Sequence, residues 1–207
     1  MRKIIVRAAL IFGGVLLAAG LFWSGLYNIG ADDEHWPPVY AALDILRERS
    51  IAVRANKLDV PPLDDPALIR SGAGNYAAMC QGCHRAPGLA ASELSLGLYP
   101  QPPQLADPAR KPEAAHDFWA IKHGIKASGM PAWGRSMKDP YLWGMVAFLQ
   151  KLPTLSAQQY QELVESSEGH SHGGGEDHDS DHDHEDHDHH DETGVGSHLH
   201  DGHSHSH

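Results

Sequence analysis

Cys80-Gln81-Gly82-Cys83-His84 is the stretch that decides the fold of this 207-residue chain. Two cysteines three residues apart, with a histidine directly after the second, form the attachment motif of a covalently bound haem. The two thiols add to the vinyl groups of the porphyrin, and the adjacent imidazole reaches the iron from one face. The chain has no other cysteine, so a tetrahedral zinc site lacks its second ligand pair. The motif therefore predicts one haem c held by Cys80, Cys83 and His84.

Helix-start signals on both sides of this motif predict an all-α fold. Asp65-Pro66 has the N-cap and first-turn residues of a helix that runs into Cys80. A second start of the same kind, Asp139-Pro140, opens a later helix. Gly72 and Tyr76 lie eight and four residues before Cys80, and therefore on one face of the first helix. The chain here resembles class I cytochromes c, in which a small residue and an aromatic on that face cross the C-terminal helix.

The resemblance implies a distal ligand and several residues around the haem. The segment Gly129-Met130-Pro131-Ala132-Trp133 matches the loop on which this family presents its second axial ligand, Met130. Pro87 is expected to supply the carbonyl that accepts a hydrogen bond from the ligating imidazole. Tyr99 and Trp133 are expected either to donate to the haem propionates or to pack in the core. Three side chains remain as alternative distal ligands: Met137, His116 and His123.

The axial ligands determine which function is expected. An iron held between His84 and Met130 has no open position for a substrate, and the thioether raises its reduction potential. We therefore expect a single-electron carrier, not an enzyme, that serves membrane or periplasmic redox proteins. A haem sensor with a labile distal ligand, a metal-handling protein that uses the haem as a redox accessory, and a subunit of a larger oxidase or dehydrogenase are the alternatives. The mildly basic balance between residues 70 and 151 gives no indication of nucleic-acid binding.

The N-terminal segment is predicted to anchor the chain in a membrane. The apolar run from Ala8 to Ile29 would span about 33 Å as a helix, which is enough for a bilayer core. Basic residues before the run and acidic residues after it place the N-terminus in the cytoplasm. We expect residues 1–31 to be a single-pass inner-membrane anchor with the haem domain in the periplasm. A cleavable signal peptide, with a small-residue site near Ala18-Ala19-Gly20, is the alternative.

Composition divides the rest of the chain into four parts. Residues 32–64 are predicted to be a membrane-proximal helical connector, with an extended break at Pro61-Pro62. Residues 65–153 are the expected haem domain, in which the proline-rich segment 89–111 is an irregular loop along the haem edge. Residues 154–167 form a short helix that starts with a capping box at Ser156. Residues 168–207 are named the tail below.

The tail has an unusual composition. It holds 13 of the 17 histidines and twelve acidic residues, with no Lys or Arg. It has too few apolar side chains to order itself, which predicts a disordered segment. Imidazoles interleaved with carboxylates suit Zn, Cu or Ni, and a flexible tract cannot select sharply among them. The alternative is a soluble, pH-responsive tail without a metal function.

Overall fold

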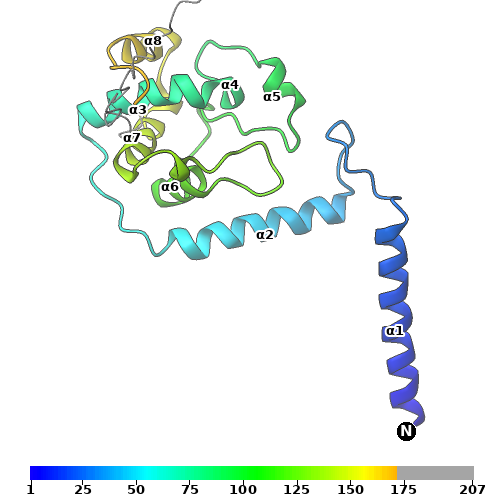
Figure 1. Ribbon diagram of the computed structural model, residues 1–207. Helices are drawn as coiled ribbons and strands as arrows, with labels where there is room; N and C mark the ends of the chain where they lie inside the picture. The colour runs from blue at the N-terminus through cyan, green and yellow to red at the C-terminus, as the bar shows by residue number, and fades with distance from the viewer. Residues whose placement is uncertain (172–207) are drawn as a thin grey trace, which may run out of the picture. The chain divides into compact units, whose positions relative to one another are not determined.

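The computed structural model describes residues 1–171, and these residues form helices joined by loops, with no strand among them (Figure 1). The expectation of an all-α fold is therefore confirmed. Apart from residues 168–171, the predicted tail lies outside the described residues, so its disorder stays a prediction. The helices are α1 (Arg2–Trp23), α2 (Pro37–Ala55), α3 (Pro66–Met79), α4 (Gln81–His84), α5 (Glu93–Gly97), α6 (Ala114–His123), α7 (Asp139–Leu149) and α8 (Ala157–Glu165), with 3₁₀ turns η1 (Trp133–Arg135) and η2 (Leu152–Thr154).

The crossing of α3 and α7 is the centre of the fold (Figure 1). Helix α3 begins as predicted, because the Asp65 side chain accepts a hydrogen bond from the backbone N–H of Ala67 at 2.9 Å. Gly72, in the middle of α3, lies directly against the backbone of Gly144 in α7. A β-carbon at Gly72 would lie 1.9 Å from the Gly144 carbonyl oxygen, whereas one at Gly144 would lie 3.3 Å from the Leu68 carbonyl oxygen. The small residue predicted at position 72 is therefore needed for the close crossing.

Helix α8 covers the other part of α3 and completes an aromatic cluster. Tyr76 packs against Phe148 of α7, with 5.2 Å between ring centroids, and against Tyr160 of α8 at 6.5 Å. All three side chains are almost fully buried. The capping box predicted at Ser156 is present, since Ser156 and Gln159 bond to each other's backbone N–H groups. The short helix is thus a packed part of the haem domain.

Helix α6 connects the haem domain to the connector. On one side, the ring of Phe118 stacks on Trp143 of α7 at 3.9 Å. On the other side, Trp119 lies under the guanidinium of Arg54 in α2, at 5.9 Å. The connector helix buries Ile51 and Ala55, which lie in its last turns. Within the described residues 1–171, α2 has buried residues only in this C-terminal part.

Two helix boundaries and one additional helix differ from the sequence-based expectation. Helix α1 runs over Arg2–Trp23 instead of 8–29, because Gly25 adopts a left-handed φ of +66° that ends the helix. The loop predicted over 89–111 contains α5, which the Ser92 side chain caps by accepting from the Ser95 N–H. Helix α7 begins at Asp139, so this residue lies in the first turn, where its charge favours the helix dipole, and is not the N-cap.

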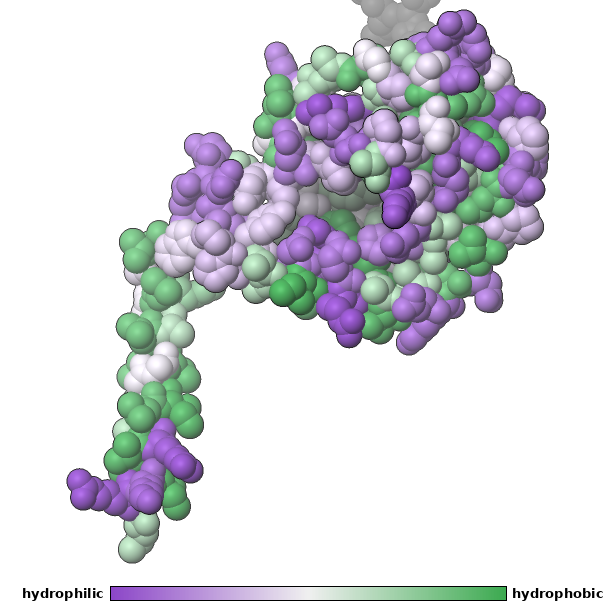
Figure 2. All heavy atoms as spheres, turned by 180° about the vertical axis from the view of Figure 1, so that it is seen from behind, coloured by the Kyte–Doolittle hydropathy of each residue, from purple (hydrophilic) through white to green (hydrophobic). Residues whose placement is uncertain are grey.

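Helix α1 has the length and composition of a membrane span, and among the described helices no other meets both criteria. None of its residues is buried in the structure. Figure 2 shows apolar residues along the helix and a hydrophilic end, which corresponds to the basic residues near the N-terminus. A signal sequence would share these properties, so both predicted N-terminal roles agree with the structure.

Candidate haem-binding site

The attachment motif forms a single tight turn at the end of α3. Cys80 is the C-cap of that helix and the N-cap of α4, and its carbonyl accepts a hydrogen bond from the His84 N–H at 2.8 Å. The turn therefore presents both cysteines and the histidine from one short segment. Neither cysteine is in a disulfide. Burial, followed by the neighbouring Cys83, raises the pKa of the Cys80 thiol to about 12.

A backbone carbonyl orients the imidazole of His84. Its Nδ1 lies 2.9 Å from the carbonyl oxygen of Pro103, which can only accept a hydrogen bond. Nδ1 must therefore carry the proton, which leaves the lone pair on Nε2 for a metal. Burial lowers the pKa of His84 below its usual range, more than the Pro103 bond raises it, and this favours the neutral ring that a ligand requires.

The prediction that Pro87 supplies this carbonyl was wrong, because the acceptor in the structure is Pro103. Pro87 lies in the turn that immediately follows α4, and the chain needs a longer excursion to return to the imidazole. The proline-rich loop makes that excursion, and Leu105 N–H also approaches the His84 carbonyl at 3.4 Å. The three prolines in the segment 100–103 were the sequence feature that could have indicated this acceptor. Their spacing does not show which carbonyl faces the imidazole.

Met130 lies in a loop whose two ends are joined by a backbone hydrogen bond. The Ile125 N–H donates to the Met130 carbonyl at 3.1 Å, and the Ser128 hydroxyl bonds to the Ile125 carbonyl and accepts from the Met130 N–H. Gly124 has a φ of +64°, and a β-carbon there would lie 2.7 Å from the Met130 carbonyl oxygen. Met130 is half-buried and packs against the hydrophobic core that contains Cys80.

The alternative distal ligands have other structural roles. The Nε2 of His116 lies 3.3 Å from a carboxylate oxygen of Glu48 in α2. His123 is exposed at the end of α6, where its ring lies 4.7 Å from that of Trp119. Met137 is 4% exposed within the core. His116 thus has a carboxylate partner, His123 lies against Trp119 in an exposed position, and Met137 is a core residue.

The two residues expected near the propionates lie in different settings. The Tyr99 hydroxyl accepts a hydrogen bond from the backbone N–H of His35 in the connector at 3.1 Å, and the two rings meet edge to face. This leaves the hydroxyl proton of Tyr99 for another acceptor. Trp133 begins η1 and is half-buried against the core. Core packing, one of the two predicted roles, is thus observed for Trp133. Donation to a propionate stays a prediction for both residues.

The structure adds Arg110, which sequence analysis missed. Its Nη2 forms an ion pair with Asp117 at 2.5 Å, and both side chains are largely buried. Its Nη1 is buried and has no hydrogen-bond partner within residues 1–171. The positive charge of Arg110 is close enough to contribute to lowering the pKa of His84. A haem propionate is an anion that would satisfy Nη1, so the residues present fit a haem. In the sequence, Arg110 is indistinguishable from a solvated loop cation.

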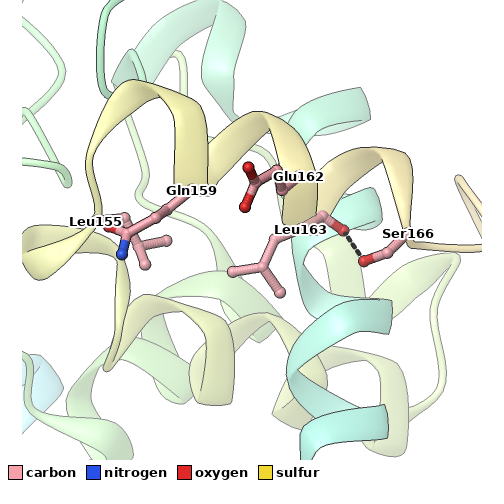
Figure 3. Close-up of a pocket in the computed structure, with 5 residues that line it drawn as sticks. All are labelled: Leu155, Gln159, Glu162, Leu163 and Ser166. Carbon is pink, nitrogen blue, oxygen red and sulfur yellow. Dashed lines mark hydrogen bonds between the residues drawn. The ribbon is translucent and has the colours of Figure 1, made fainter.

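Two shallow depressions lie outside this site. One has a volume of about 340 Å³ and follows an exposed face of α8, as Figure 3 shows. It is lined by Leu155, Gln159, Glu162, Leu163 and Ser166. The other, of about 250 Å³, lies beside Lys122, His123 and η1. Neither contains a residue of the attachment motif, so neither is the haem site.

The comparison with known families agrees with this site. Residues 67–149 match a family model described as "Cytochrome C oxidase, cbb3-type, subunit III". These residues are a c-type cytochrome domain. The cytochrome domain runs from the first turn of α3 to the end of α7, and thus includes the attachment motif and Met130. Its identity implies a covalently bound haem c, haem-based electron transfer and redox partners. No curated protein and no solved structure gave a match.

The predicted metal binding by the tail is not tested by the family match or by the described structure. Within residues 1–171, no group of three or more His, Cys, Asp or Glu side chains could hold a metal ion. The histidines on which the prediction depends lie almost entirely beyond residue 171. The predicted Zn, Cu or Ni binding therefore falls outside the described residues.

Proposed function

We propose that this protein carries single electrons on one haem c with His84 and Met130 as axial ligands, tethered to the periplasmic side of the inner membrane. The bound haem supplies a reversible one-electron couple. The observation that carries the proposal is the bond between His84 Nδ1 and the Pro103 carbonyl, at 2.9 Å. It sets the tautomer and the plane of the imidazole, as the nitrogen opposite a metal requires.

Met130 is proposed as the second ligand because its loop is held by the chain itself. The hydrogen bonds among Ile125, Ser128 and Met130 restrict the loop without help from a ligand. A thioether on such a loop loses little conformational freedom when it binds. With both axial positions filled, the centre exchanges electrons and performs no bond chemistry, so we propose no enzymatic activity.

Two methionine variants of the full chain test this ligand assignment. In Met130→Leu, we expect loss of the weak long-wavelength band that iron–methionine coordination gives in the oxidised spectrum, and a lower reduction potential. Met137→Leu is the matched control, because it makes the same change at a buried core methionine and should keep both signals. An unchanged spectrum and potential in Met130→Leu would contradict the assignment. A vacant or labile distal site in the unaltered protein would favour a haem sensor.

Membrane tethering is proposed from α1 and has a separate test. Helix α1 is apolar over a length that spans a bilayer, and covalent haem attachment fits an extracytoplasmic location for the cytochrome domain. We expect the mature protein to retain residues 1–31, to stay in the membrane fraction after alkaline carbonate washing, and to be cut by protease only from the periplasmic side. Release into the soluble fraction with a shortened N-terminus would instead establish a signal peptide.

The family match favours a second candidate, a subunit of a membrane oxidase. The matching model carries the description of a subunit III of a cbb3-type cytochrome c oxidase. Purification of the full chain from detergent-solubilised membranes discriminates between the candidates. A stoichiometric partner complex would support a subunit, whereas a haem protein that purifies alone and is reoxidised by added periplasmic acceptors would support a carrier.

The tail's composition favours a third role, transition-metal handling. A chain truncated before residue 168 separates this role from electron transfer. Loss of metal tolerance with unchanged electron transfer would support the third role. Unchanged metal tolerance would argue against the third role.

A further inference from the structure

The connector helix α2 exposes an apolar surface over its first half. In the part of the chain that the structure describes, the helix is buried only in its last turns, where Ile51 and Ala55 lie. The large apolar side chains before that point have exposed fractions between 42% and 66%. They are Trp36, Tyr40, Leu43, Ile45 and Leu46. So much exposed apolar surface within eleven residues is unfavourable in water and indicates a partner.

Charge is distributed unevenly along the same helix. Between Trp36 and Leu46 the only ionisable acid or base is Asp44, and its carboxylate is ion-paired with Arg47. The second half carries three cations, Arg47, Arg49 and Arg54, against one acid, Glu48, which pairs with Arg47 at 3.0 Å. Helix α2 therefore has an apolar, nearly uncharged start followed by a cationic part. An apolar first half followed by a cationic second half matches surroundings that are apolar at the start of the helix and anionic towards its end.

The chain between α1 and α2 is folded back on itself. The Tyr27 hydroxyl bonds to Nδ1 of His35 at 2.7 Å, and the Tyr27 ring meets Trp36 edge to face at 5.1 Å. Tyr27 lies four residues after the end of α1, and Trp36 directly precedes α2. These contacts keep the start of α2 close to the end of the membrane span. Wherever α1 leaves the bilayer, α2 therefore begins at the bilayer surface.

We propose that the first half of α2 binds the headgroup region of the bilayer that α1 spans. Leu43, Ile45 and Leu46 would enter the acyl boundary, and Trp36 and Tyr40 would lie at the depth that interfacial aromatics prefer. Arg49 would meet lipid phosphates. Leu43 and Ile45 point about 160° apart around the helix, with Leu46 between them, so the apolar arc covers nearly half of the helix surface. The inference rests on the proposed membrane anchoring.

This arrangement would determine where the cytochrome domain works. Contacts from the second half of α2 reach α6 through Glu48 with His116 and through Arg54 with Trp119. A helix fixed at the bilayer surface would therefore hold the cytochrome domain beside the membrane. The haem would then exchange electrons with membrane-bound partners at that surface. Both proteins would meet by diffusing in the plane of the bilayer.

Spin labelling of the full-length holoprotein tests the inference. Haem attachment consumes Cys80 and Cys83, so a cysteine introduced as Leu46→Cys is the single site for a nitroxide. The protein is reconstituted in vesicles of phosphatidylcholine and phosphatidylglycerol, and the label's accessibility to oxygen and to a water-soluble nickel chelate is compared. We expect the oxygen-to-nickel ratio at position 46 to be several-fold higher than at Glu162→Cys, an exposed control on α8.

A second variant keeps the outcome interpretable. With Leu43→Glu and Leu46→Glu together, a label introduced as Ile45→Cys should lose its membrane-like ratio while the haem spectrum stays unchanged. A water-like ratio at Leu46→Cys in the otherwise unaltered protein would overturn the proposal. A label shielded from both reagents would also overturn it, because α2 would then contact protein. Co-flotation with vesicles after carbonate washing reports on α1 alone, so failed anchoring is recognised separately.

Discussion

Gly72 of α3 lies so close to Gly144 of α7 that a β-carbon on Gly72 would be 1.9 Å from the Gly144 carbonyl oxygen. Because both sides of this contact are backbone, no rotamer change can relieve the clash. We expect Gly72→Ala to lower the free energy of unfolding by about 3 kcal/mol, at the upper end of the usual cost of overpacking. Urea denaturation followed by circular dichroism measures the change.

The control for this substitution is Gly97→Ala at the end of α5. A β-carbon there meets nothing within 4 Å, so its effect should stay below about 0.5 kcal/mol. Equal destabilisation by both alanines would mean that helix–helix approach does not account for the glycine at position 72.

Gly124 and Gly129 should differ in their influence on the Met130 loop. Gly124 has a φ of +64°, and a β-carbon there would collide with the Met130 backbone. At Gly129 the obstacle is the flexible end of Leu98, at 2.5 Å, which can move aside. We expect Gly124→Ala to strain the loop by roughly 1–3 kcal/mol and to weaken the iron–methionine band. Gly129→Ala should retain most of that band, and the reverse order would argue against Met130 as the ligand.

Removing the charge of Arg110 should lower the reduction potential. A cation close to the haem disfavours the additional positive charge of the oxidised iron. In Arg110→Gln we expect a decrease on the order of tens of millivolts, from the Coulomb interaction in a partly buried setting. Arg110→Lys keeps the charge and should remain near the unaltered value. Potentiometric titration of both variants decides this, and equal shifts would indicate that packing, not charge, is responsible.

Tyr160 connects α8 to the attachment motif through one hydrogen bond. Its hydroxyl donates to the side-chain oxygen of Gln81 at 2.7 Å. Tyr160→Phe leaves that oxygen without its donor and should lower the free energy of unfolding by about 1 kcal/mol. Tyr141→Phe is the control, because the Tyr141 ring only packs against the core. A similar decrease in the free energy of unfolding for Tyr141→Phe would mean that the hydrogen bond to Gln81 is not the cause.

The same residue predicts how stability depends on alkaline pH. Burial raises the pKa of Tyr160 from 10.0 to about 12. Between these values the native protein keeps a proton that the unfolded chain releases, so stability falls as the pH rises from 10 to 12. Below pH 10 this residue should have no effect. Tyr160→Phe should show a shallower decline in urea denaturation across this range, and a parallel curve would contradict the assignment.

Local sequence patterns were sufficient to predict much of the fold. The caps at Asp65 and Ser156 define helix starts through bonds within a few residues, so spacing alone reveals them. The same holds for the attachment motif, whose three functional residues lie within one turn. Boundaries were less reliable, since the end of α1 depends on the backbone conformation of Gly25 and α5 lies within a proline-rich segment.

The tertiary structure alone decided which distant groups meet at the site. Pro103 approaches His84 from 19 residues away, and no local rule distinguishes its carbonyl from that of Pro87. Arg110 became a candidate haem partner only when burial against Asp117 left one of its nitrogens without an acceptor. The sequence by itself determined the chemistry, namely two thiols, an imidazole and a thioether within an all-helical domain. Burial and long-range contacts, which depend on how the loops return to the core, decided which groups orient and surround that chemistry.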